Sequence, residues 1–210
     1  MTAHRSPIRR AAAVVAAATA AVVLAACGGG NDGPAGHDDH EKTSSPTAPA
    51  SAGQGQRNAA DIAFAKGMIP HHRQAVEMAA MAETRSRSAE VKRLAAEIKK
   101  AQGPEIKTLS GWLTAWGEEV PEGNESGEHA GHSMSGMMTS KDMDNLEKSS
   151  GRAFDTAFLE LMIKHHEGAV EMARTERSGG AYRPAKDMAG DIVTSQSAEI
   201  TRMKKLLGEN

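Results

Sequence analysis

The sequence predicts an all-α protein, an antiparallel four-helix bundle built from two repeated helical hairpins. A segment beginning at Asp61 and a segment beginning at Asp155 align without a gap, at a constant offset of 94 residues. Within each copy the apolar and histidine positions step by three and four residues, which places them on one face of an α-helix. A hairpin with one apolar face cannot bury that face alone, so the two hairpins are expected to pack together.

The N-terminus has the pattern of a bacterial lipoprotein signal. A basic stretch precedes an apolar run of alanine and valine, which ends in Leu24-Ala25-Ala26-Cys27. This run is too short to cross a membrane and ends in small residues typical of a cleavage site. We therefore predict a signal peptide at 1–26 and a lipidated Cys27, which would anchor an extracytoplasmic protein to the membrane.

Composition divides the remainder of the chain. Residues 27–57 are rich in Gly, Pro, Ser and charge without apolar periodicity, which predicts a flexible tether. The run HDDHE at 37–41 could hold a metal ion loosely, but a solvated acidic spacer is favoured, because nothing nearby would preorganise a site. The folded part, 58–210, is expected to consist of repeat one (58–117), a Met- and His-rich link (118–150) and repeat two (151–210).

Each repeat is expected to form two helices. Ser88 is a suitable N-cap for the second helix of repeat one. Ser178-Gly179-Gly180 provides the break between the helices of repeat two, and a short helix is expected in the link after Ser140. Pro70 and Pro104 fall inside predicted helices, where each removes a backbone hydrogen bond. The matching positions of repeat two carry ordinary residues, so we expect kinks rather than breaks.

Two Met-x-x-His-His clusters are the strongest functional signal. Adjacent residues on a helix point about 100° apart, so both histidines of a pair can lie near one wide inward face. Such residues can also be ordinary core or satisfied polar groups, but their repetition gives convergent ligands near a pseudo-twofold axis. The predicted ligands are Met68, His71, His72 and Met78 in repeat one, and Met162, His165, His166 and Met172 in repeat two.

The link carries a second cluster of methionine and histidine. In a Gly- and Ser-rich setting these methionines have no core to fill, which favours capture of a soft metal ion over packing. We expect independent, weaker sites here. The candidate ligands are His129, His132, Met134, Met137 and Met138.

Ligand chemistry points to copper. The one cysteine is assigned to lipid, so a metal site must use His, Met, Asp or Glu. Imidazole and thioether together favour a soft or borderline ion, and among first-row metals copper suits them. Four polar residues of the second helices are expected opposite the histidine pairs, where they would orient the imidazoles; a solvated strip is the alternative. They are Gln102, Glu105, Gln196 and Glu199.

These motifs resemble a known family. The two copies of Met-Ile-x-His-His-x-x-Ala-Val-Glu-Met, with a Met-rich link between them, are similar to the "domain of unknown function 305" family of ferritin-like bundles. The resemblance covers about Asp61 to Leu207. It implies copper binding or copper tolerance outside the cytoplasm. The sequence contains no Glu-x-x-His, so it lacks the motif of a di-iron site.

We therefore expect a lipoprotein for copper binding, storage or tolerance, with metal ions and the membrane as partners. The net charge of −2 argues against a nucleic-acid partner. The sequence has no nucleophile elbow, phosphate loop or His-Glu-x-x-His motif. A metal-dependent redox enzyme using the same histidines and a structural envelope module without metal are the alternatives.

Overall fold

The computed structural model describes residues 55–123 and 135–208. All regular secondary structure within these ranges is helical. The helices are α1 (Ala59–Arg85), α2 (Ala89–Trp116), α3 (Ser140–Lys148), α4 (Gly151–Gly179) and α5 (Arg183–Leu207). The predicted signal peptide, Cys27 and the link residues His129, His132 and Met134 lie outside the described residues.

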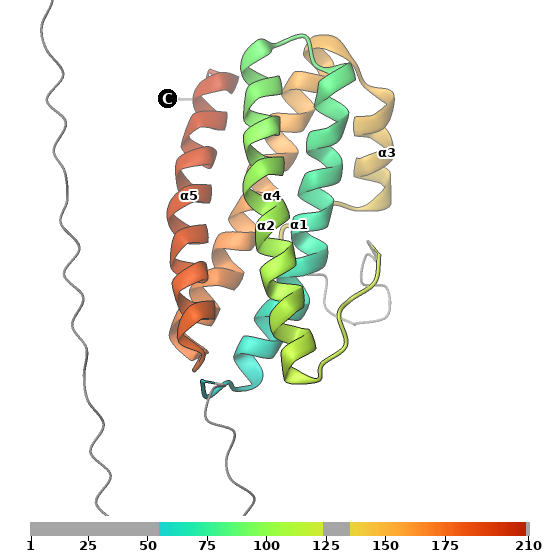
Figure 1. Ribbon diagram of the computed structural model, residues 1–210. Coiled ribbons are helices and arrows are strands. Elements are labelled where there is room, and N and C mark those ends of the chain that lie inside the picture. The colour runs from blue at the N-terminus through green and yellow to red at the C-terminus, as the bar shows by residue number, and fades with distance from the viewer. Residues whose placement is uncertain (1–54, 124–134, 209–210) are drawn as a thin grey trace, which may run out of the picture. The chain divides into compact units, whose positions relative to one another are not determined.

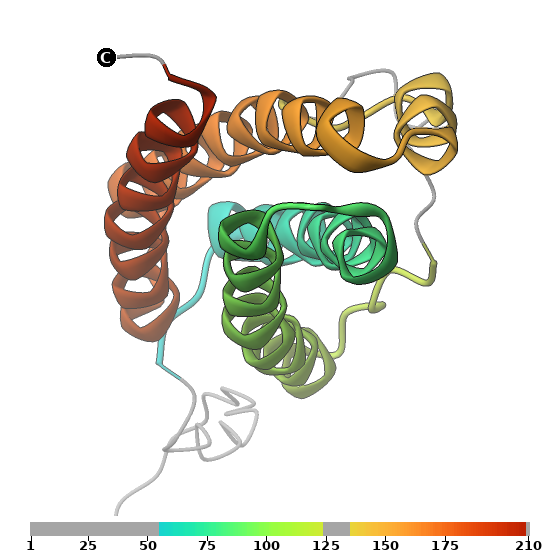
Figure 2. The same cartoon turned by 90° about the horizontal axis from the view of Figure 1, so that it is seen from above.

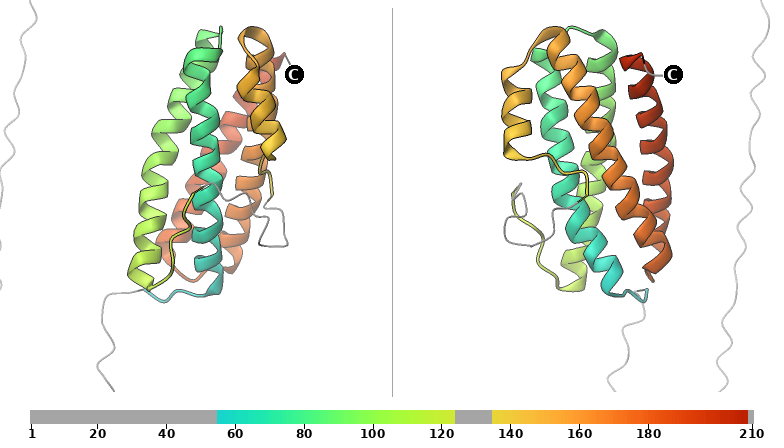
Figure 3. Two further views of the ribbon diagram at one scale, coloured as in Figure 1. Left: turned by 90° about the vertical axis from the view of Figure 1, so that its right-hand side faces the viewer. Right: turned by 180° about the vertical axis from the view of Figure 1, so that it is seen from behind.

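The four long helices form an antiparallel bundle of two hairpins (Figure 1). α1 pairs with α2 and α4 pairs with α5, and the hairpins meet where α1 packs against α4. Seen from above, the short helix α3 lies beside α1 and α4 at one corner of the bundle (Figure 2). The side and rear views show α1 and α4 running in opposite directions along their contact (Figure 3). The predicted fold class is confirmed. None of the described helices is long and apolar enough to span a membrane.

Local sequence sets the helix ends. Asn58 and Asp61 form a capping box at the start of α1, in which the Asn58 N–H donates to Asp61 at 2.6 Å. Ser88 caps α2 as predicted, accepting from the Val91 N–H at 3.3 Å. α4 ends at Gly179, within the predicted Ser-Gly-Gly sequence, and α5 begins at Arg183. α1 and α2 continue through Pro70 and Pro104 without interruption.

The bundle contains two apolar clusters, one toward each end. Fully burying a large apolar side chain stabilises a fold by about 1.5–3 kcal/mol, so both clusters contribute substantially. The first core lies near the α1–α2 turn and includes Met78, Leu94, Ile98, Phe154, Phe158 and Met203. The second core lies near the α4–α5 turn and includes Phe64, Ile69, Leu109, Leu113, Trp116 and Ile192.

Two equivalent aspartates tie the hairpins together. Asp61 on α1 accepts the backbone N–H of Tyr182, between α4 and α5, at 2.9 Å. Asp155, its counterpart on α4, accepts the Ser86 hydroxyl, between α1 and α2, at 2.5 Å. The first helix of each hairpin therefore holds the turn of the other hairpin.

Glu176 on α4 breaks the symmetry of these ends. Its side chain is only 1% exposed and lies beside Asp61, whereas the matching position of repeat one is the buried Ala82. Neither oxygen of Glu176 makes a well-formed hydrogen bond. Burial, followed by the proximity and charge of Asp61, raises the pKa of Glu176 to about 8. The group is therefore mostly protonated at neutral pH.

We predict that Glu176→Gln stabilises the protein at neutral pH and flattens its pH dependence. Between the ordinary pKa of 4.5 and the folded value of about 8, the folded protein keeps a proton that the unfolded chain has released. The free energy of unfolding therefore falls as pH rises through this window, by up to about 1.4 kcal/mol per pH unit. Glutamine resembles the protonated carboxyl and removes this contribution. Urea unfolding at several pH values between 5 and 8 would measure it.

The exposed Glu160 on the same helix provides the control, because Glu160→Gln should leave the pH dependence unchanged. Parallel pH profiles for the parent and Glu176→Gln would show that Glu176 titrates normally.

Candidate metal centre

The four helical histidines meet between the two cores. His71 and His72 on α1 and His165 and His166 on α4 are all 0% exposed. The rings of His71 and His165 contact across the α1–α4 interface, with centroids 3.8 Å apart. Within each helix the adjacent rings are 6.4 Å apart. We call this group the histidine layer.

Carboxylates from the second helix of each hairpin anchor the outer two imidazoles. Glu105 on α2 lies 2.7 Å from His72 Nε2, and Glu199 on α5 lies 2.7 Å from His166 Nε2. The two contacts are related by the sequence repeat. A carboxylate accepts hydrogen bonds, so each Nε2 carries a proton, and in the neutral imidazole each Nδ1 then keeps its lone pair.

The inner imidazoles differ from one another. His71 Nε2 lies 3.2 Å from the backbone oxygen of Ser135, which lies within the link. A carbonyl oxygen can only accept, so Nε2 of His71 donates and its Nδ1 is unprotonated. His165 has no hydrogen-bond partner on either ring nitrogen. The link thus reaches the histidine layer on the His71 side.

Burial keeps the inner pair neutral. Desolvation is the main cause that lowers the pKa of His71 to about 3, and repulsion from His72 adds to it. Desolvation, followed by repulsion from His71, also places the pKa of His165 well below its ordinary value. Metal ions bind the neutral form of imidazole, so these groups need not lose a proton at neutral pH to become ligands.

Buried polar atoms without a hydrogen-bond partner lie in the histidine layer and on the second helix of each hairpin. Such buried atoms are rare, and each costs about 1–3 kcal/mol, which favours a ligand that would satisfy them. Among the described residues, however, no three His, Cys, Asp or Glu side chains stand ready to hold an ion. An ion held in this layer would therefore require some of these side chains to reorient. The unpartnered atoms are Nδ1 of His71, His72, His165 and His166, Nε2 of His165, and Oε1 of Gln102 and Gln196.

The predicted methionine ligands of the helices divide between the two cores. Met68 is fully buried in the second core, and Met162 is fully buried in the first. Because α1 and α4 are antiparallel, these equivalent residues lie on opposite sides of the histidine layer. Met78 belongs to the first core, and Met172 is partly buried at the edge of the second. All four pack as apolar residues, and Met68 and Met162 lie one turn from a histidine.

Only two of the predicted link ligands fall within the described residues. Met137 is partly buried. Met138 is buried in the first core, so the expectation that link methionines have no core to fill is wrong for this residue. The Gln74 side chain forms hydrogen bonds with both backbone groups of Met138. These bonds bring the Met138 side chain into the bundle.

The repeat did not reveal the contacts of Ser135, Gln74 and Glu176. Each of these contacts occurs in one half of the bundle only, so comparison of matched positions in the two repeats does not predict it. The sequence does carry one signal, because Gln74 aligns with Gly168 and Glu176 aligns with Ala82.

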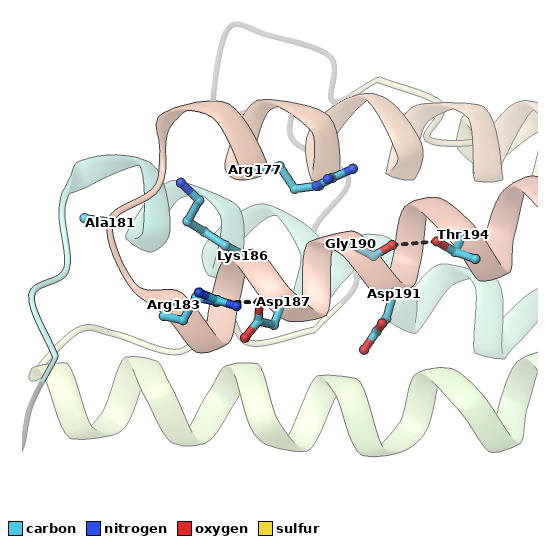
Figure 4. A pocket seen from close by; sticks show the side chains of 8 residues that line it. All are labelled: Arg177, Ala181, Arg183, Lys186, Asp187, Gly190, Asp191 and Thr194. Atoms are coloured by element: carbon cyan, nitrogen blue, oxygen red, sulfur yellow. Dashed lines mark hydrogen bonds and ion pairs between the residues drawn. The ribbon is translucent and has the colours of Figure 1, made fainter.

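A surface cleft at the α4–α5 turn is distinct from the histidine layer. Arg177 and Lys186 line it together with Arg183, which is paired with Asp187 at 2.7 Å (Figure 4). Asp191 adds a second acidic group. This mixture of charges does not select a ligand of either sign.

The fold and the histidine layer define a class of two-repeat helical bundles with a polar centre between apolar cores. The chain belongs to the family described as Domain of unknown function (DUF305), which it matches over residues 61–207. The family resemblance predicted from the repeated motif is confirmed. No curated protein gives a significant match.

Solved structures of similar proteins cover most of the described bundle. A DUF305 protein from Streptomyces coelicolor is 34% identical, with a TM-score of 0.65, over 71% of this chain and 92% of that chain. A DUF305 fragment from Deinococcus radiodurans is 31% identical, with a TM-score of 0.65, over 72% and 97%. CopM in its Cu(II)-bound form is 36% identical, with a TM-score of 0.60, over 70% and 94%. Structures of CopM also exist in Cu(I)-bound and Ag-bound forms.

The carboxylate contacts predict fixed tautomers for the outer imidazoles. In the metal-free protein, His72 and His166 should carry their protons on Nε2. Replacing Glu105 with alanine should release His72 into a mixture of tautomers, while His166 stays fixed. Glu199→Ala should have the reverse effect. Long-range proton–nitrogen correlation spectra distinguish the forms, and unchanged His72 signals in Glu105→Ala would contradict the assignment.

Proposed function

We propose that this protein binds copper in the histidine layer and serves in copper storage or tolerance outside the cytoplasm. The observation that carries the proposal is the set of four buried imidazoles whose Nδ1 atoms have no partner. The supporting comparison is CopM, a similar bundle with Cu(I)-, Cu(II)- and Ag-bound structures.

The donor set fits a soft or borderline ion. The inner histidines His71 and His165 are neutral, and all four Nδ1 atoms lack a partner. Thioethers lie one helical turn away at Met68 and Met162. Thioethers contribute little to hard ions, whereas imidazole alone would not separate copper from zinc. We therefore propose that His71, His72, His165 and His166 bind the ion with methionine assistance. Met78 and Met172 lie farther along the same helices.

Neighbouring polar groups would support these ligands. A ligating imidazole usually donates its second N–H to a carboxylate or carbonyl, which fixes its orientation and raises its basicity. Glu105 and Glu199 are within hydrogen-bond distance of the outer pair. Gln102 and Gln196 bring buried amide oxygens that lack partners. Complete burial of the histidines favours holding an ion over turnover of a substrate.

The link is proposed to add weaker copper sites. Its candidate donors are His129, His132, Met134 and Met137, which combine imidazole with thioether. Met138 is the least available of the original set, because its side chain already packs in the first core. These donors would raise capacity without forming the tightest site.

Substitution of the contacting histidines tests the main site. In the double variant His71→Gln and His165→Gln, the tightest Cu(I) site should weaken by roughly 100-fold or more, since two ligands are removed. Helix content should stay the same, because the apolar cores are untouched. Competition against a Cu(I) chelator measures the affinity, and circular dichroism checks the fold.

A matched pair of link substitutions serves as the control. His129→Gln with His132→Gln should lower capacity and leave the tightest site intact. Equal Cu(I) affinity in the parent and the His71/His165 variant would refute binding in the histidine layer.

The N-terminal sequence supports a proposed lipid anchor at Cys27. A single acylated residue would hold the mature protein at the membrane surface. Cys27→Ala should therefore shift the protein from the membrane fraction to the soluble fraction of expressing cells. Sedimentation of the variant with membranes to the same extent as the parent would exclude Cys27 as the anchor.

A further inference from the structure

We propose that the segment Ser135–Met138, here called the strap, positions one of the histidine ligands of the metal centre. In this proposal the Ser135 carbonyl fixes His71 with its Nδ1 lone pair available to the ion. Gln74 and Gly168 are the positioning residues that hold the strap in place. The inference rests on the proposed function, because it concerns the same site.

Gln74 holds one end of the strap. Its side chain is buried on α1, next to the histidine layer. Gln74 Oε1 accepts the N–H of Met138 at 2.7 Å, and Gln74 Nε2 donates to the Met138 carbonyl at 3.0 Å. Both backbone groups of one residue are thus satisfied by one buried amide. The Met138 side chain packs in the first core and secures the same point.

Gly168 makes room for the other end. The backbone of Ser135 and Gly136 lies so close to α4 that a Cβ on Gly168 would overlap the Ser135 carbonyl group. Gly136 has a positive φ of 79°, and a side chain there would meet the backbone of α4 at Lys164 and Gly168. The Ser135 hydroxyl also donates to Glu171 on α4 at 2.5 Å. The carbonyl that faces His71 is therefore held from two sides.

The repeat shows that this arrangement is asymmetric. Gln74 and Gly168 occupy equivalent positions in the two halves, at the offset of 94 residues. One residue binds the strap, and the other provides the space for it. The equivalent histidines differ as a result: His71 has a carbonyl partner, and His165 has none.

Fixing His71 should strengthen metal binding. An imidazole whose proton is held on Nε2 presents Nδ1 without a change of tautomer, and the accepting oxygen raises its basicity. Loss of such a supporting hydrogen bond typically weakens metal affinity by about 10–100-fold. The strap would thus make part of the link a component of the tight site, in addition to the weaker sites proposed for the link.

Two variants displace the strap without altering any imidazole. Gly168→Ala places a methyl group against the Ser135 carbonyl, and Gln74→Leu removes both hydrogen bonds to Met138 without adding a donor atom for the ion. Gly111→Ala is the matched control for Gly168→Ala, because it is also a helical glycine and its added Cβ would contact nothing. Circular dichroism identifies any variant that fails to fold. If Gly168→Ala does not fold, Gln74→Leu decides the outcome.

Two measurements test the proposal on each protein. Cu(I) competition against a chelator should show affinity lowered by roughly 10–100-fold in Gly168→Ala and Gln74→Leu, and unchanged in Gly111→Ala. Long-range proton–nitrogen spectra of the metal-free proteins should show His71 fixed with its proton on Nε2 in the parent and control only. The tautomer readout separates a positioning role from a general loss of stability.

The outcomes distinguish the strap from the proposed function. If folded Gln74→Leu keeps the parent's His71 tautomer, or loses it while binding Cu(I) as tightly as the parent, the strap has no positioning role. If the parent itself binds no Cu(I), the proposed function fails, and with it the role of the strap in metal binding.

Discussion

The contact between two buried imidazoles sets the requirements for the rest of the bundle. His71 and His165 meet where α1 crosses α4, in the layer that separates the two apolar cores. Polar groups in such a place are costly unless they are hydrogen-bonded or bound to a ligand. The carboxylates of α2 and α5 and the carbonyl of the strap satisfy three of the eight ring nitrogens. The nitrogens that remain account for the chemistry proposed for this site.

Much of the fold followed from local pattern and repetition. The spacing of Phe64, Met68, His71 and Ala75 defined a helical face, and its repetition predicted two hairpins packed through equivalent helices. The same repetition placed Glu105 and Glu199 opposite the histidine pairs. The burial of Met138 could not be predicted in this way, because its backbone pairs with a side chain 64 residues away. No periodic pattern records a contact of that kind.

The methionines show why residue type alone does not assign a ligand. Met68, Met78 and Met162 fill apolar cores and also lie on helices that carry the histidines. A flexible thioether suits both tasks, since it packs well and can bind a soft ion. The distinction depends on whether a side chain can turn toward the imidazoles when an ion enters. For the histidines, the unpartnered nitrogens support the proposed role as ligands.

The reciprocal contacts of Asp61 and Asp155 relate the two hairpins of this chain as the subunits of a symmetric dimer are related. In an isologous interface, a residue of one subunit contacts the second subunit in the same way that its counterpart contacts the first. Here the two subunits are hairpins joined by one covalent link, so identical residues are no longer required at equivalent sites. The fused architecture can specialise each half separately. Gln74 opposite Gly168 and Ala82 opposite Glu176 are such specialisations, which two copies of one hairpin could not carry.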